Sequence, residues 1–139
     1  LNRFLPPTAV RVLLDESGAN LTSKISFTGL GKNLQKVNKS LARDLIKSRH
    51  DPLRELLTQG EGEAERELPS IVEAAETRMR AQLDAELARL TALAEHNPAV
   101  RSEELEALKQ ERQALSNAIE NTRLRLDSVR VIITVDPNA

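Results

Sequence analysis

The sequence predicts an α+β fold: a small antiparallel three-stranded sheet, a basic amphipathic helix, and a long antiparallel helical hairpin inserted before the last strand. Three observations predict it. Apolar residues recur at alternating steps of three and four over 105–129, which is a heptad pattern on a helix. A second apolar run in helical register, 72–94, precedes it across a short loop. β-branched residues alternate with polar ones near both chain ends, which is typical of strands.

The strands are expected at the two ends of one domain that spans residues 1–139. Residues 9–15 and 21–27 alternate in hydropathy around a turn that contains glycine and asparagine, which predicts a β-hairpin over 9–27. The β-branched run 130–136, ended by Pro137, is expected to add the third strand. A third strand is needed because an isolated two-stranded hairpin is only marginally stable in water.

A basic amphipathic helix is expected over residues 32–48. Its cations lie about two positions out of step with its apolar stripe, so they share the opposite face. This face is either a solvated surface or a binding surface for phosphates or an acidic protein. No aromatic residues are interleaved with it to stack on bases. The candidate binding residues are Lys32, Lys36, Lys39, Arg43 and Lys47.

The helical hairpin is expected to have its arms at 52–95 and 102–129 and to pack as a coiled coil. A kink or break near 67–70 is expected, because Pro69 and two upstream glycines disfavour a helix interior. Arg112 interrupts the seam and is expected to pair with Glu86 or Glu95, or to extend into solvent. The predicted seam consists of Leu83, Leu87, Leu90, Leu105, Leu108, Leu115, Ile119 and Leu126.

Composition and charge exclude several classes of function. The chain has no cysteine and two isolated histidines, so we expect no disulfide, no metal site and no thiol nucleophile. The alternating glutamates of 61–67 point to different faces of a helix, which indicates a solvated surface rather than a catalytic pair. The glycines near Lys32 lack the spacing of a phosphate loop, so we expect no bound cofactor. No catalytic residue is predicted.

The distribution of charge is uneven although the net charge is only −1. Residues 24–54 carry 8 basic and 2 acidic side chains, whereas residues 55–107 carry 5 basic and 13 acidic ones. No apolar run approaches the roughly 18 to 20 residues that cross a bilayer, so a cytoplasmic location is expected. Because the sequence begins with Leu1 rather than methionine, we expect a fragment of a longer polypeptide.

Three stretches resemble the C-terminal part of the bacterial RNA polymerase recycling factors, the RapA or HepA family. They are Phe4–Asp15 (FLPPTAVRVLLD), the loop His96-Asn97-Pro98 with Arg101 and Glu104-Leu105, and Arg123–Ile132 (RLRLDSVRVI). The resemblance implies a parent hydrolase of the helicase superfamily that uses ATP and magnesium on nucleic acid, including DNA, to release RNA polymerase. In that family the ATPase motifs belong to two upstream lobes, so no catalytic residue carries over to this chain.

The resemblance therefore implies a non-catalytic C-terminal accessory domain that acts in transcription regulation. Such a domain is expected either to brace the ATPase lobes of its parent or to contact RNA polymerase. A nucleic-acid-binding module that uses the basic helix and the hairpin is the alternative. A stand-alone enzyme is a third hypothesis, which would require turnover by this chain alone.

Overall fold

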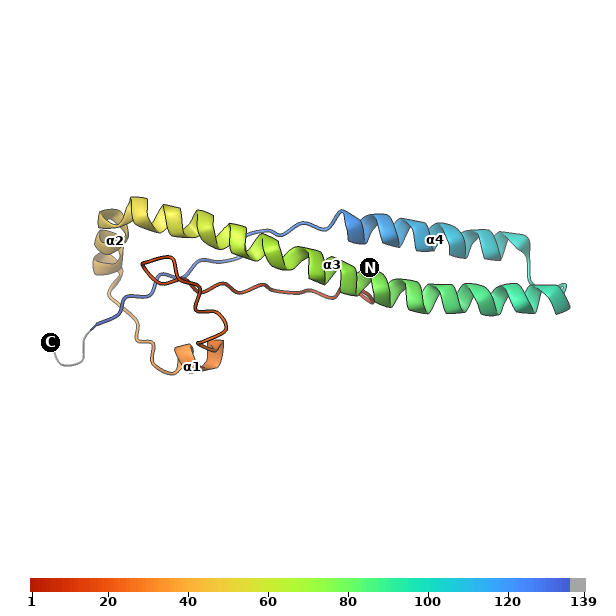
Figure 1. Cartoon of the computed structure of the whole chain (residues 1–139), viewed down its shortest axis with the longest axis horizontal. Coiled ribbons are helices and arrows are strands. Elements are labelled where there is room, and N and C mark those ends of the chain that lie inside the picture. The colour runs from red at the N-terminus through yellow and green to blue at the C-terminus, as the bar shows by residue number, and fades with distance from the viewer. Residues whose placement is uncertain (136–139) are drawn as a thin grey trace.

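A computed structural model describes residues 1–135, in which the regular secondary structure is helical and there is no β-strand. The predicted α+β fold with a three-stranded sheet is therefore wrong. Figure 1 shows a long helix along the whole molecule, a second helix antiparallel to its C-terminal half, and extended chain near both termini. The helices are α1 (Phe27–Gly31), α2 (Lys39–Ser48), α3 (His50–His96) and α4 (Ser102–Glu120).

Helix α3 runs for 47 residues without the break that was expected near 67–70. It passes through Gly60, Gly62 and Pro69. A proline removes the hydrogen bond to the carbonyl four residues earlier, which here belongs to Glu65. Both Glu65 and Pro69 are exposed, so water can satisfy that carbonyl and the helix continues.

The core lies where the N-terminal arm meets α3 and α4. Phe4 is only 3% exposed, although it belongs to no helix. The Nη2 of Arg78 donates a hydrogen bond of 2.9 Å to the Phe4 carbonyl, which fastens the arm to α3. The core therefore joins three segments that are distant in sequence. Its buried apolar members are Phe4, Ala75, Met79, Leu83 and Ile119, with Leu5, Val72, Leu108 and Leu115 packed against them.

The β-hairpin predicted over 9–27 is reduced to one antiparallel bridge between Leu14 and Asn20. Gly18 lies in the connecting turn with φ of +85°, which side chains with a Cβ rarely adopt. The Nε2 of Gln59 donates a hydrogen bond of 2.6 Å to the Gly18 carbonyl. The turn is thus held against α3.

Side-chain hydrogen bonds around Thr22 replace the ladder that a hairpin requires. The Oδ1 of Asn20 accepts from both the backbone N–H and the hydroxyl of Thr22. The Thr22 hydroxyl in turn accepts from the backbone N–H of Leu13. The Nη1 of Arg11 donates to the carbonyls of Thr22 and Ile25. Local side-chain bonds of this kind compete with strand pairing.

The basic helix predicted over 32–48 begins seven residues late, at Lys39. The side chain of Asn38 accepts a hydrogen bond of 2.9 Å from the Ser40 backbone N–H, which caps the helix. Phe27 was expected to end the second strand, but it begins α1, which is capped by Ser26. Only Arg49 separates α2 from α3.

The second hairpin arm was expected to reach residue 129, but α4 ends at Glu120. The side-chain amide of Asn121 donates to a carbonyl of the last turn, which helps to end the helix. Residues 122–135 that follow have no helix or strand assignment, so the strand predicted over 130–136 does not form in the described part. Asp136 and Pro137 lie outside the described residues.

Candidate functional site

The predicted basic surface is only partly assembled on one element. Lys39, Arg43 and Lys47 lie four residues apart on α2 and therefore on one side of it. Lys32 follows α1 as its C-terminal cap, and Lys36 lies in the connection between the two helices. All five side chains are exposed. In the part of the chain that the structure describes, none of them forms an ion pair.

The α2 helix also exposes apolar side chains, because it buries none of its residues. Leu41 is 52% exposed and Ile46 is 44% exposed. Arg49, directly after α2, adds an exposed cation that the expected helix register over 32–48 did not include. An amphipathic helix whose cations and several of whose apolar side chains are exposed can dock on an acidic surface or follow phosphates.

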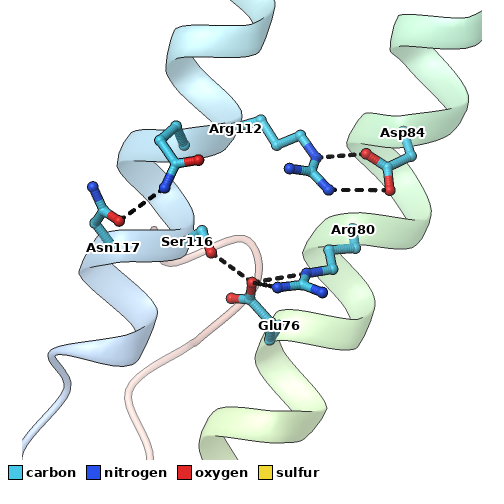
Figure 2. Close-up of polar contacts among 7 residues, drawn as sticks. Glu76, Arg80, Asp84, Arg112, Ser116 and Asn117 are labelled. Carbon is cyan, nitrogen blue, oxygen red and sulfur yellow. Dashed lines mark hydrogen bonds and ion pairs between the residues drawn. The ribbon is translucent and has the colours of Figure 1, made fainter.

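The register of the hairpin is set by a pair that the sequence did not identify. Arg112 on α4 donates through Nε to Asp84 Oδ1 at 2.5 Å and through Nη2 to Asp84 Oδ2 at 3.4 Å, as Figure 2 shows. The prediction that Arg112 pairs with Glu86 or Glu95 is therefore wrong. Glu86 pairs instead with Arg3 at 3.4 Å. The hydrogen bond and the charge of Asp84 raise the pKa of Arg112.

A second cross-link between the helices is centred on Glu76. Its Oε1 accepts a hydrogen bond of 2.6 Å from the Ser116 hydroxyl on α4 and lies 2.9 Å from the Arg80 guanidinium (Figure 2). Ser116 is buried at 6% exposure, so its hydroxyl needs this partner. The four-residue spacing of Glu76 and Arg80 was the signal available in the sequence. No pattern in the sequence predicted the contact between Glu76 and Ser116.

The predicted seam residues fall into three groups. Leu83 and Ile119 are buried, and Leu108 and Leu115 pack against them in the core. Leu126 is 54% exposed and lies beyond α4. The remaining members are half-buried: Leu87, Leu90 and Leu105.

The hairpin tip is packed less tightly than its base. Beyond Leu83, no α3 side chain is buried, and Leu93 is 43% exposed. An open hollow of about 510 Å³ lies on this part of α3. Apolar and small side chains with carboxylates at both ends suit a protein contact better than a small polar substrate. The hollow is lined by Asp84, Leu87, Ala88, Thr91, Ala92 and Glu95.

The described residues offer neither a metal site nor a helix that could span a membrane. Among residues 1–135 no three His, Asp or Glu side chains converge as metal ligands do. Within the same range no helix is sufficiently long and apolar to span a bilayer. What the described surface offers is an exposed basic helix at one end and a loosely packed hairpin tip at the other (Figure 1).

Comparison with known proteins gives one family and several relatives. The model of the RNA polymerase recycling family C-terminal region matches residues 1–134. An "RNA polymerase-associated protein RapA" of Photobacterium profundum is 41% identical over 133 residues. The protein of that name from Actinobacillus pleuropneumoniae serotype 3 is 40% identical over 134 residues. Each alignment covers 96% of this chain but 14% of the relative's length.

Proposed function

We propose, from the premise that this chain belongs to the RNA polymerase recycling family and corresponds to its C-terminal region, that it is a non-catalytic accessory domain of a polymerase recycling factor. In that factor, ATP and magnesium bind elsewhere in the longer polypeptide. The helical hairpin serves as an arm whose tip contacts RNA polymerase. Its relatives are named RNA polymerase-associated proteins, which supports polymerase as the partner.

The uneven packing along the hairpin is the observation that carries this proposal. At the base, Met79, Leu83 and Ile119 are buried, and the pair between Arg112 and Asp84 holds the helices in register. The tip lacks such a core and exposes Leu93 beside the hollow on α3. A rigid base with an incompletely covered apolar tip is suited to present a contact surface to a large partner.

Binding of the full-length family member to RNA polymerase tests the tip. Ala92 lines the hollow, whereas Ala81 is another exposed alanine of α3 that does not line it. We expect Ala92→Arg to weaken binding about tenfold or more, because a long charged side chain fills a desolvated contact. Ala81→Arg is the matched control and should bind normally. Equal affinities for both variants and the unmodified protein would rule out the tip contact.

The non-catalytic assignment has its own test. Incubating this chain with ATP and magnesium should release no phosphate above the buffer control, because no phosphate loop or ligand cluster is present in its described residues. Phosphate release proportional to the concentration of the chain would overturn the assignment.

A nucleic-acid-binding role is the second candidate, and the exposed α2 cations favour it. Lys39, Arg43 and Lys47 lie on one side of an exposed helix and form no ion pair within residues 1–135. Cations spaced in this way can follow a phosphate backbone. The same cations also suit an acidic protein surface, so the two outcomes must be separated by experiment.

Titration with duplex DNA and with RNA at several salt concentrations separates them. If α2 and the connection before it bind phosphates, charge reversal at Lys36, Lys39 and Arg43 should abolish binding. Each phosphate contact that is lost should reduce the slope of log K against log salt by about 0.9 for duplex DNA. Reversal of three exposed hairpin cations, Arg89, Arg101 and Lys109, changes the net charge equally and is the control. Unchanged binding after the reversals at Lys36, Lys39 and Arg43 would exclude this candidate.

A further inference from the structure

The C-terminal segment beyond α4 leaves its backbone unpaired. Among the described residues, 123–135 form no backbone–backbone hydrogen bond, and the last such bond runs from the Thr122 N–H to the Ile119 carbonyl. Figure 1 shows the segment extended along the molecule toward the α2 end. A row of free N–H and C=O groups on extended chain is a ready template for strand pairing.

The side chains of this segment form an uncovered apolar stripe. Successive residues of an extended chain point to opposite sides, so residues two apart share a side. On one side lie four β-branched residues, and none of them is buried. On the other side Arg130 and Thr134 are exposed and Ile132 is half-buried. The exposed members of the stripe are Val129 (57%), Val131 (41%), Ile133 (45%) and Val135 (82%).

The composition of the segment agrees with its extended backbone. Valine and isoleucine favour strands because their branched side chains pack on a pleated surface. A stripe of four such residues left in water is costly and prone to aggregation unless a partner covers it. The segment therefore has the backbone, the side chains and the exposure of an edge strand, but it has no partner strand within residues 1–135.

The length of the relatives indicates where the partner strand is located. This chain corresponds to 14% of their length, while its match to the family model runs to residue 134 and so includes the stripe up to Ile133. Pairing within one polypeptide avoids the cost of association because the two segments are tethered. Self-pairing of two copies is less favourable, since a stable dimer buries about 1,200 Å² or more in total, beyond what two seven-residue segments cover.

We propose that residues 129–135 pair as an edge strand with a β-strand from the remainder of the longer polypeptide, and that this pairing attaches the helical arm to its parent. The partner is an edge strand whose apolar side chains lie directly across from Val131 and Ile133 on the same face of the pair. The inference depends on membership of the family and does not depend on the proposed contact between the tip and polymerase.

Hydrogen exchange on the full-length protein tests whether the segment is paired. The alternate amides of 129–135 that face the partner should exchange about a hundredfold or more slowly than in unstructured peptide, because they are hydrogen-bonded in the ladder. Exchange of all these amides at the unstructured rate would overturn the proposal. Unchanged polymerase binding by Ala92→Arg would overturn the tip contact without affecting the expected exchange of 129–135, so the two proposals fail separately.

A photo-crosslinker placed at position 131 of the full-length protein identifies the partner. Cross-links to peptides outside the region matched by this chain, within one copy, are the expected result. Mixed isotope-labelled and unlabelled protein reveals cross-links between copies, which would overturn the proposal in favour of a dimer. Cross-links confined to residues 1–122 would also overturn it, because the segment would then pair within this chain.

Two substitutions on opposite sides of the segment provide a matched control. Ile133→Glu should abolish the slow exchange of 129–135, since it places a charge against the apolar partner, whereas Thr134→Glu should preserve it. Amides of α3 and α4 serve as the folding control and should stay equally protected in both variants. Equal protection of 129–135 in both variants would show that the stripe is not covered by a partner.

Discussion

The guanidinium of Arg112 lies across from the carboxylate of Asp84 and donates two hydrogen bonds to it, joining α4 to α3 next to the buried Leu83. The side chains are 31% and 52% exposed, so water and salt screen much of their attraction. The geometry is nevertheless specific, because a bidentate pair of hydrogen bonds forms only when the two helices are in one register. The pair therefore fixes alignment more than it adds stability.

A charge-swap cycle tests this function of the pair. Arg112→Asp should lower the melting temperature measured by circular dichroism, because the new carboxylate faces both Asp84 and Glu76. The double variant Arg112→Asp with Asp84→Arg should recover most of that loss. The differences should shrink at high salt, as expected for partly exposed charges. A double variant no more stable than the worse single variant would contradict the assignment.

The two phenylalanines provide a matched test of the N-terminal arm. Phe4 is 3% exposed in the core, whereas Phe27 is 67% exposed at the start of α1. Phe4→Ala should lower the free energy of unfolding by about 3 kcal/mol or more. Phe27→Ala should change it by no more than about 0.5 kcal/mol. Denaturant titration measures both, and equal losses would show that the arm is not part of the cooperative core.

Helical periodicity was the most informative part of the sequence. Apolar steps of three and four over 72–94 and 105–119 coincide with regions that are helical in α3 and α4. The resemblance to the RNA polymerase recycling family is confirmed by the family match over residues 1–134. The periodicity and the resemblance each depend on many residues at once, so a single exception such as Pro69 does not change either prediction. Predicting a continuous helix through Pro69 would have required knowing that Glu65 is exposed to solvent.

The sheet was mispredicted because alternation alone does not supply pairing partners. Residues 129–135 alternate as a strand does, yet no neighbouring segment of the described chain pairs with them. Around Thr22, the Asn20 side chain accepts from the Thr22 N–H and the Arg11 side chain donates to the Thr22 carbonyl, so both backbone groups that a ladder would have used are satisfied. The capping role of Asn38 was readable from the sequence, but the basic helix was started at Lys32 instead. In the segment 129–135 and around Thr22, contacts with the rest of the chain determine the secondary structure more than the local pattern of residues does.

Two glycines should respond to alanine with opposite signs. At Gly18, φ is +85° and an added Cβ would lie 2.7 Å from the Gln59 Oε1, so Gly18→Ala should destabilise by about 1 to 2 kcal/mol. At Gly62, inside α3, an added Cβ meets nothing within 4 Å, so Gly62→Ala should stabilise by about 0.5 to 1 kcal/mol. Chemical denaturation measures both. Stabilisation by Gly18→Ala would contradict the observed turn.

The carboxylate of Asp15 is predicted to make the turn sensitive to acid. Hydrogen bonds from the Ser17 hydroxyl and then from the Ala19 backbone N–H lower the pKa of Asp15 below its ordinary value of 3.8. Because the folded pKa is the lower one, this stabilisation is present above pH 3.8 and is lost as the pH falls through the folded pKa.

Carbon-detected NMR titration of the Asp15 carboxyl should therefore give a midpoint below 3.8. Ser17→Ala removes the largest cause and should move the midpoint upward. Ser23→Ala changes an exposed serine outside this turn and should leave the midpoint unchanged. A midpoint of Asp15 that does not respond to Ser17→Ala would show that the hydroxyl does not hold the carboxylate.

The contrast between the base and the tip of the hairpin can be tested with two leucines of α3. Leu83 is 2% exposed beside Ile119, whereas Leu93 is 43% exposed near the tip. Leu83→Ala should lower the free energy of unfolding by about 2 to 5 kcal/mol, through lost burial and an unfilled cavity. Leu93→Ala should cost less than about 1 kcal/mol, because that side chain contributes little buried area. If Leu93→Ala were as costly as Leu83→Ala, the tip would be part of the core, and it would not be free to contact polymerase.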